Sequence, residues 1–313
     1  MGMLMLVKYQ GLGNDFLIAL DGQGLDVSSR ERADRAPTEA AGSGSPAGSD
    51  HLGELVRALC DRHTGVGADG LLVLRAAVSG GDVRMELRNA DGSRAETSGN
   101  GLRCFALAIV EAGLVPGPEV AIETDSGVRR AVLHQHDGPG SADVSVEMGL
   151  LRVVPSSPVA DVSLPGSMAL PWPAWSVDAG NPHLVVLAPS LDGVAVATVG
   201  PTLQRLRPGG QNVEIVTCGP GSGELSLLVW ERGAGATLAC GSGSVAAAGA
   251  LYSAGISPAR VRVHNPGGTA EVSLSGDDPL ALGAELGGPV QRVARIAVDP
   301  ADLGESTTVV VPS

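Results

Sequence analysis

ERGAGATLACGSGSVAAAGA, residues 231–250, places a single cysteine between a glycine-rich turn and a run of small helix-forming residues. The cysteine is Cys240, and the pattern predicts that it lies at a helix N-terminus. Free backbone N–H groups at such a terminus favour negative charge, so a thiol there ionises more easily. We therefore interpret Cys240 as a nucleophile or a proton-transfer group in preference to a buried small side chain.

The same pattern occurs once more in the chain. SGNGLRCFALA, residues 98–108, aligns without gaps to CGSGSVAAAGA, residues 240–250. Identical residues stand at four aligned pairs, which are Gly99/Gly241, Gly101/Gly243, Ala106/Ala248 and Ala108/Ala250. Each helix is preceded by strands and followed by a hairpin pattern. The repeat predicts an internal duplication, with two helix N-termini facing each other across a cleft. Ser98 then stands opposite Cys240.

Length and composition limit the class of protein. A chain of 313 residues is long enough for two domains, and 43% hydrophobic with 18% charged residues is ordinary for a globular protein. A net charge of -13 argues against nucleic-acid or anionic-membrane partners, and 2% aromatic residues argue against base-stacking surfaces. We find no signal-peptide pattern and no apolar run long enough to span a membrane. A cytoplasmic protein with reduced thiols is expected.

Two observations argue against common cofactors. Lysine occurs once, at Lys8 in a predicted first strand, and a pyridoxal-phosphate enzyme needs a lysine for its Schiff base. The four cysteines form no C-x-x-C pair, and the histidines form no familiar ligand spacing with carboxylates or cysteines. We expect no cofactor and no metal.

Periodicity and turn signals predict an α/β (α+β) fold. Helices are expected at 51–62, 102–112, weakly at 199–206, and from the Cys240 turn to about residue 254. Strands are expected at 3–9, 16–20, 71–74, 83–87, 119–124, 129–134, 143–148, 184–187, 213–218, 224–230, 260–264, 270–274, 290–298 and 307–311. Residues 22–50 are rich in Gly, Ser, Pro and Ala, which predicts a flexible insertion. The predicted domains are 1–140 plus 287–313, and 141–286.

Two opposed helix N-termini could grip one carboxylate from both sides. An acid and a base would then flank the adjacent carbon, which is the arrangement for moving a proton between the two faces of an α-carbon. Without a pyridoxal ring, preorganised N–H dipoles must stabilise the carbanion. His183 is a candidate proton partner for Cys240, and Glu231 could contact a substrate ammonium or bias the thiol. Arg232 could bind a carboxylate.

Six motifs together resemble the diaminopimelate epimerase family. They are GLGNDF (11–16), RHTGVGADG (62–70), RNADGSRAETSGNGLRC (88–104), GNPH (180–183), NVE (212–214) and ERGAGATLACGSG (231–243). The resemblance implies a pyridoxal-independent enzyme that interconverts LL- and meso-diaminopimelate in lysine and cell-wall precursor synthesis. It also implies two pseudo-symmetric domains, each a curled sheet around one helix, with the site in the cleft between them. A homodimer is the expectation that the family suggests.

The resemblance also assigns roles to residues. Cys240 corresponds to one of two catalytic cysteines, and His183 and Glu231 to the pair that helps set thiol ionisation. The residues that correspond to substrate ligands are Asn14, Asn89, Asn181, Asn212 and Arg232, the last four of them for the distal carboxylate and ammonium. The backbone at Gly99, Asn100, Gly241 and Ser242 corresponds to the clamp on the α-carboxylate.

Two departures leave alternatives open. Ser98 stands where the family has its other cysteine, and Ala236 stands where an acidic residue is usual. A serine hydroxyl is a poor base unless a neighbour takes its proton, and Cys104 lies about 9 Å farther along the helix. The chain could be a diaminopimelate epimerase with a native or introduced serine, a related racemase with another substrate, a one-base dehydratase that uses Cys240 with Ser98, or an impaired paralogue that only binds.

Overall fold

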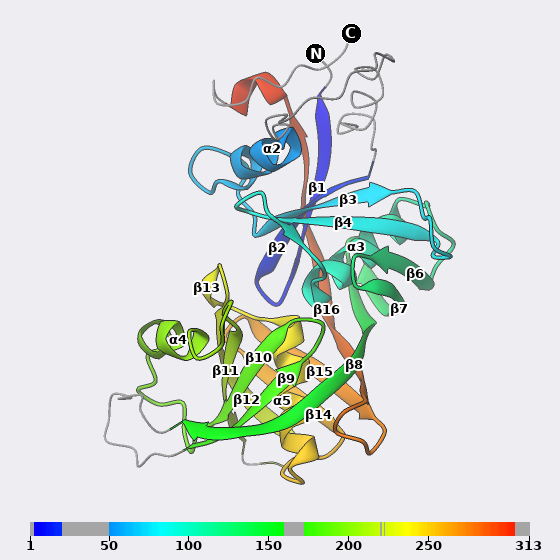
Figure 1. Ribbon diagram of the computed structural model, residues 1–313. Helices are drawn as coiled ribbons and strands as arrows, with labels where there is room; N and C mark the ends of the chain where they lie inside the picture. The colour runs from blue at the N-terminus through cyan, green and yellow to red at the C-terminus, as the bar shows by residue number, and fades with distance from the viewer. Residues whose placement is uncertain (1–2, 21–49, 160–171, 220, 222, 304–313) are drawn as a thin grey trace, which may run out of the picture.

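The computed structural model describes residues 3–20, 50–159, 172–219, 221 and 223–303 (Figure 1). The predicted insertion at 22–50, apart from Asp50, and the predicted strand at 307–311 lie outside the described residues. The described part forms two lobes of similar build, one above the other in Figure 1.

Two long strands belong to both lobes. They are β8 (Ser141–Val159) and β16 (Leu282–Val298), and they pair antiparallel from Ser141 with Gln291 to Leu151 with Leu282. Figure 1 shows them running from one lobe into the other. The sequence predicted only part of each strand, because turn residues such as Gly149, Gly287 and Gly288 interrupt the apolar pattern inside them.

The upper lobe is a closed ring of strands around one helix. In chain order its further strands are β1 (Leu4–Gly11), β2 (Asn14–Ala19), β3 (Gly70–Arg75), β4 (Val83–Asn89), β6 (Glu119–Thr124) and β7 (Gly127–Gly138), with the short β5 (Arg94–Ala95) beside β4. The enclosed helix is α3 (Gly99–Glu111), and α2 (His51–Cys60) lies outside the ring.

The lower lobe repeats this plan. Its further strands are β9 (Trp172–Asp178), β10 (Pro182–Leu187), β11 (Asn212–Cys218), β12 (Glu224–Glu231), β14 (Arg260–Asn265) and β15 (Gly268–Ser275), with the short β13 (Gly235–Thr237) beside β12. The enclosed helix is α5 (Gly241–Ser253), and α4 (Val196–Gln204) lies outside. The last described element is the 3-10 turn η2 (Pro300–Leu303).

Strand pairing confirms the predicted duplication. Going round the upper ring from β16, the pairings are antiparallel, antiparallel, parallel, antiparallel, parallel and antiparallel before β7 meets β8. Going round the lower ring from β8 gives the same order. The outer helix and the enclosed helix also occupy matching connections. The fold predicted from the repeated motif is therefore correct. The domain boundaries stay a prediction, and β16, which runs through both lobes, crosses the predicted boundary at residue 287.

The enclosed helices are buried on nearly all faces. In α3 every residue from Gly99 to Ile109 is buried, and in α5 every residue from Gly243 to Leu251 is buried. Small side chains let a helix fit inside a narrow ring of strands, which explains why α5 is largely Ala, Gly and Ser. The burial predicted from their composition is confirmed. No helix in the described ranges is long and apolar enough to cross a membrane.

Candidate active site

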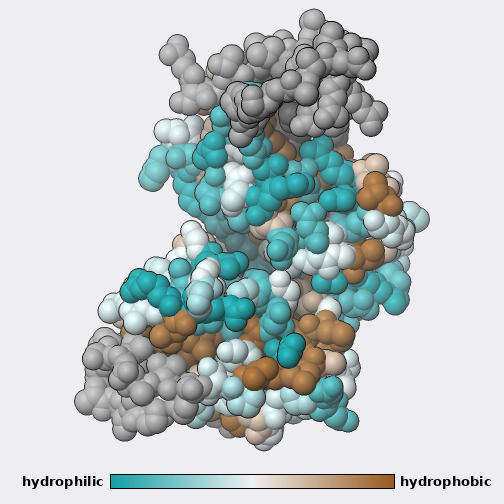
Figure 2. All heavy atoms as spheres, in the orientation of Figure 1, coloured by the Kyte–Doolittle hydropathy of each residue, from teal (hydrophilic) through white to brown (hydrophobic). Residues whose placement is uncertain are grey.

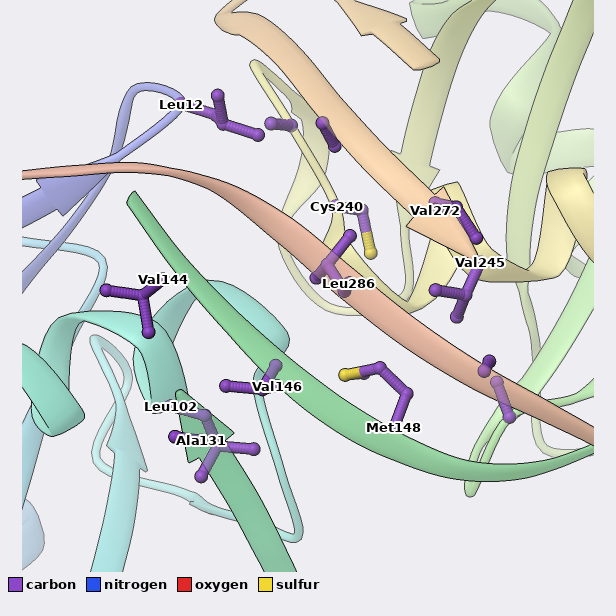
Figure 3. Close-up of a cluster of buried hydrophobic side chains, with 14 of the residues drawn as sticks. Leu12, Leu102, Ala131, Val144, Val146, Met148, Cys240, Val245, Val272 and Leu286 are labelled. Carbon is purple, nitrogen blue, oxygen red and sulfur yellow. The ribbon is translucent and has the colours of Figure 1, made fainter. Parts of the chain in front are cut away.

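The N-terminal tips of α3 and α5 touch. A Cβ built on Gly241 would lie 3.2 Å from Gly99 Cα and 3.3 Å from Asn100 N. It would also lie 2.8 Å from Cδ2 of Leu286 on β16, which is closer than carbon atoms normally approach. Figure 3 shows Leu286 close to Cys240, and Met148 on the neighbouring β8. Only residues without a side chain fit here, so the two glycines bring free N–H groups from both helices together.

Ser98 and Cys240 occupy equivalent positions. Each is the N-cap of its helix with an extended backbone, at φ -145° and ψ 121° for Ser98 and φ -125° and ψ 119° for Cys240. Gly101 N donates to Ser98 Oγ at 3.1 Å, and Gly243 N donates to Cys240 Sγ at 3.3 Å. Figure 2 shows a hollow between the lobes, bordered largely by hydrophilic residues. The structure thus gives Ser98 and Cys240 the same capping geometry, and their action as a pair on one substrate stays a prediction.

Cys240 is 6% exposed and lies in an acidic environment. Burial raises the pKa of its thiol well above the ordinary value, and Glu231 and Glu214 raise it further. Hydrogen bonds from Ser242 and from Gly243 N act in the opposite direction, and Ser242 Oγ lies 3.4 Å from the sulfur. The expectation that the helix N-terminus makes this thiol easier to ionise is therefore wrong, because burial and two carboxylates outweigh the N–H groups. The thiol needs an acceptor before it can remove a proton.

Glu231 is suited to be that acceptor. It ends β12 and accepts a hydrogen bond from Thr237 Oγ1 at 2.5 Å. Burial raises the pKa of its carboxyl group, while hydrogen bonds from Thr237 and Cys240 lower it. A raised carboxyl pKa makes Glu231 a stronger base than an ordinary carboxylate, and its hydrogen bond with Cys240 gives the thiol proton a direct route to it.

His183 belongs to a buried pair that the sequence only half predicted. Its Nδ1 lies 2.8 Å from Glu214 Oε1, and both side chains are fully buried. Its Nε2 lies 2.8 Å from Asn181 Oδ1. The carboxylate keeps a proton on Nδ1 and so fixes the orientation of the ring. We expected His183 to be a proton partner but assigned no role to Glu214. The signal for Glu214 was its charge inside an otherwise apolar strand, at the end of the NVE motif.

Glu214 also faces the tip of α5. A Cβ built on Gly243 would lie 2.7 Å from Glu214 Oε1, so the carboxylate packs against the first helical turn. Its Oε2 is buried and has no hydrogen-bond partner in the described residues. The positive end of the helix dipole favours a carboxylate in this position.

The Ser98 side has no comparable groups. Within the described ranges, no carboxylate, imidazole or amine lies within hydrogen-bond distance of Ser98 Oγ, whose contact is the N–H of Gly101. Cys104 lies inside α3 and not at its N-cap, its side chain is 0% exposed, and burial raises its pKa to about 12. The expectation that Cys104 cannot stand in for Ser98 agrees with this burial.

The predicted side-chain ligands other than Asn181 lie in three separate sets of hydrogen bonds. Asn14 and Asn100 are joined by a hydrogen bond from Asn100 Nδ2 to Asn14 Oδ1 at 3.4 Å. Asn212 Oδ1 accepts a hydrogen bond from the backbone N of Arg232 at 2.8 Å. The guanidinium of Arg232 is exposed, and its Nη1 donates to Gly209 O at 3.4 Å. Asn89 is exposed, and its Nδ2 donates to Ser93 Oγ at 3.1 Å.

The sequence matches a known family over most of its length. A family model described as "Diaminopimelate epimerase" matches residues 6–154 and 175–293. This chain belongs to the diaminopimelate epimerase family. A diaminopimelate epimerase of Corynebacterium glutamicum is 42% identical over 253 residues, covering 77% of this chain and 87% of the relative. One of Moorella thermoacetica is 35% identical and covers 92% of this chain and 97% of the relative.

Solved structures support the fold from greater distance. A phenazine biosynthesis protein of the PhzF family from Bacillus anthracis has a TM-score of 0.66 at 14% identity, covering 96% of this chain and 100% of its own. A probable proline racemase from Agrobacterium radiobacter has a TM-score of 0.65 at 17% identity, covering 96% and 95%. At these identities the likeness concerns the fold alone.

Proposed function

We propose that this chain interconverts LL- and meso-diaminopimelate without pyridoxal phosphate, by removing and returning the proton at one α-carbon. The observation that carries the proposal is the contact between the tips of α3 and α5, with Ser98 and Cys240 as equivalent N-caps. Membership of the family and the names of the relatives supply the substrate.

The substrate α-carboxylate would lie between the two helix tips. Free N–H groups of Gly99, Asn100, Gly241 and Ser242 would donate to its oxygens. As the α-proton leaves, negative charge moves from carbon onto the carboxylate, so these N–H groups bind the transition state more strongly than the substrate. Asn89, Asn181, Asn212 and Arg232 would hold the distal carboxylate and ammonium.

Proton transfer would then use opposite faces of the carbon. Glu231 takes the thiol proton of Cys240, with His183 held close by Glu214. The Cys240 thiolate takes the α-proton, and the Ser98 hydroxyl gives its proton to the other face of the carbanion. The Ser98 oxygen regains a proton from water, and the hydroxide so formed is neutralised by the proton that Glu231 took from Cys240, which returns all three groups to their starting state. In the reverse direction Ser98 must act as the base with no side chain to take its proton. Because both directions pass through the same transition states, this step slows the interconversion both ways.

A second function is favoured by the absence of a titratable partner at Ser98 within the described residues. If Ser98 cannot deliver a proton, Cys240 alone would exchange the α-proton with solvent and return it to the same face. A leaving group on the β-carbon would then be eliminated instead, which is the dehydratase alternative.

The remaining expectations belong to the same proposal. The chain would act in the cytoplasm, in lysine and peptidoglycan precursor synthesis, as a homodimer with domains 1–140 plus 287–313 and 141–286. It would need no cofactor, no nucleic acid and no membrane.

The direct test is to incubate the purified protein with LL-diaminopimelate and to measure the meso isomer by chiral chromatography. The expected result is slow conversion that Cys240→Ala abolishes while the fold, measured by circular dichroism, is kept. A folded protein that binds the substrate but produces no meso isomer over many hours would contradict the proposal, and would leave the one-base dehydratase and the impaired paralogue that only binds.

A further inference from the structure

Arg103 is a fully buried cation close to the proposed site. It lies on α3, three residues after Asn100, and its side chain is 0% exposed. Its Nη2 donates to Asn100 Oδ1 at 2.6 Å, while its Nε and Nη1 have no hydrogen-bond partner in the described part of the chain. A buried charge with unpaired N–H groups destabilises a fold, so its presence calls for a compensating role.

Space is kept open for this side chain. A Cβ built on Gly288 would lie 2.7 Å from Arg103 Nη1, so the missing side chain of Gly288 leaves room for the guanidinium, whereas a Cβ on Gly11 would meet Nη2 at an ordinary 3.5 Å. Burial lowers the pKa of the guanidinium to about 10, so it stays charged at neutral pH. No salt bridge to Arg103 occurs among the described residues, and its positive charge is therefore not neutralised by direct contact.

Arg103 begins a chain of side chains that ends at a carboxylate. Asn100 Nδ2 donates to Asn14 Oδ1 at 3.4 Å, and Asn14 Nδ2 donates to Asp69 Oδ2 at 2.5 Å. Asp69 is held in turn by Arg62 Nη2 at 2.7 Å and by Asp15 N at 3.0 Å. The order is thus arginine, asparagine, asparagine, aspartate.

The two ends fix the direction of both amides. A guanidinium can only donate and an ionised carboxylate can only accept. The atom of Asn100 that faces Arg103 must therefore be oxygen, and its NH₂ group must face Asn14. The atom of Asn14 that faces Asn100 must then be oxygen, and its NH₂ group must face Asp69. If either end were removed, each amide could turn over and exchange its donor for its acceptor.

We propose that Arg103 is a positioning residue for the epimerase site, which sets the amide direction of Asn100 and Asn14 and adds positive charge beneath the carboxylate clamp. The inference rests on the proposed function. Asn100 lies at the tip of α3, where its backbone N–H belongs to the clamp, and its second Nδ2 proton stays free to donate. A nearby cation favours the negative charge that develops on the carboxylate during proton removal, and Asp143, which acts on Arg103 from beyond salt-bridge distance, offsets part of its charge.

The test uses two substitutions of Arg103 and one at the far end of the chain. Arg103→Met keeps the length and removes every donor, Arg103→Lys keeps the charge and one donor, and Asp69→Asn removes the obligatory acceptor. Leu107→Ala is the matched control, because Leu107 is fully buried one turn farther along the same helix and its aliphatic side chain forms no hydrogen bond with either amide. Thermal unfolding measures the stability of all four variants.

Arg103→Met is expected to lower kcat about 10- to 100-fold, the effect of one hydrogen bond to a charged group, with a smaller change in KM. Arg103→Lys is expected to recover a large part of this loss. Leu107→Ala is expected to be less stable than the wild type yet to keep its kcat. Equal losses of kcat in Leu107→Ala and Arg103→Met would overturn the proposal, because stability alone would explain them.

A second readout does not depend on activity. Selective ¹⁵N labelling of asparagine gives side-chain NH₂ resonances for the six asparagines of the chain. The NH₂ groups of Asn14 and Asn100 are expected to exchange slowly with solvent in the wild type and in Leu107→Ala, and quickly in Arg103→Met and Asp69→Asn. Unchanged resonances in Arg103→Met would overturn the proposal even if kcat fell. If the wild type lacked epimerase activity while the resonances behaved as expected, the proposed function would fail and the positioning role would stand.

Discussion

Gly241→Ala tests whether the contact between the helix tips forms the active site. The added methyl would lie 3.2 Å from Gly99 Cα and 3.3 Å from Asn100 N, and carbon atoms normally stay about 3.5–4.0 Å apart. Relief of both contacts requires the tips to separate by roughly 0.3–0.8 Å. Overpacking of this kind costs about 1–3 kcal/mol of folding stability, and the better helix propensity of alanine offsets up to about 1 kcal/mol of it.

The effect on activity should exceed the effect on stability. A displacement of about 1 Å in a catalytic arrangement can lower the rate about 100-fold, so a shift of half that size predicts a loss of about tenfold in kcat/KM. The assay measures LL-to-meso conversion by chiral chromatography alongside thermal unfolding.

Gly249→Ala is the matched control for this substitution. It adds a methyl to the same helix, 2.7 Å from Leu151 Cδ1, in the core and away from the tips. We expect it to lose a similar amount of stability and to keep its kcat/KM. Full activity in Gly241→Ala, or an equal loss in Gly249→Ala, would refute the view that the touching tips bind the substrate carboxylate.

Two further predictions concern the groups around the tips. Glu231→Gln should lower kcat about 100-fold, because the thiol loses its proton acceptor, yet it should speed alkylation of Cys240 at a fixed pH, because the negative charge that raises the thiol pKa is gone. The carboxyl pKa of Glu231 is raised in the fold, so wild-type stability should fall as pH rises from the ordinary carboxyl pKa through the raised one, and the variant should lack this fall. Peptide mapping of alkylated Cys240 measures the first effect, and thermal unfolding against pH measures the second. An unchanged alkylation rate in the variant would contradict the role given to Glu231. Gly267→Ala would place a methyl 1.9 Å from Leu12 O, at the tip of the β1–β2 hairpin that carries Asn14, so KM should rise about tenfold. The control is Gly287→Ala, whose methyl would meet its neighbours at ordinary distances of 3.8–3.9 Å and should leave KM unchanged.

Local signals in the sequence predicted the centre of the site well. The G-x-G helix starts after Ser98 and Cys240 predicted two buried helices with matching N-caps, and the structure confirms both. These features depend on residues close together in the chain. N-cap chemistry, helix propensity and the need for glycine at a close contact can all be read from short segments.

Features that depend on distant pairings could not be predicted in the same way. The pairing of β8 with β16 joins residues about 140 positions apart. Because of this pairing, the two rings have these two strands in common. The hydrogen bond between His183 and Glu214 spans 31 positions, and the one between Asn100 and Asn14 spans 86. Glu214 and Arg103 carry charges inside otherwise apolar elements, and only their buried partners show what those charges do.

The central claim is that Cys240 and Ser98 act on opposite faces of one carbon and that the oxygen limits the reaction. The measurement is α-deuteration in D₂O, started separately from LL- and meso-diaminopimelate and followed by NMR and chiral chromatography. In the wild type, one isomer should exchange its α-proton faster than it inverts, because only Cys240 has side chains that take its proton. In Ser98→Cys, both isomers should exchange, and inversion should be faster by about 10²- to 10⁴-fold, the usual contribution of a positioned acid or base. Equal inversion rates in the wild type and in Ser98→Cys, with both isomers exchanging alike, would contradict the account.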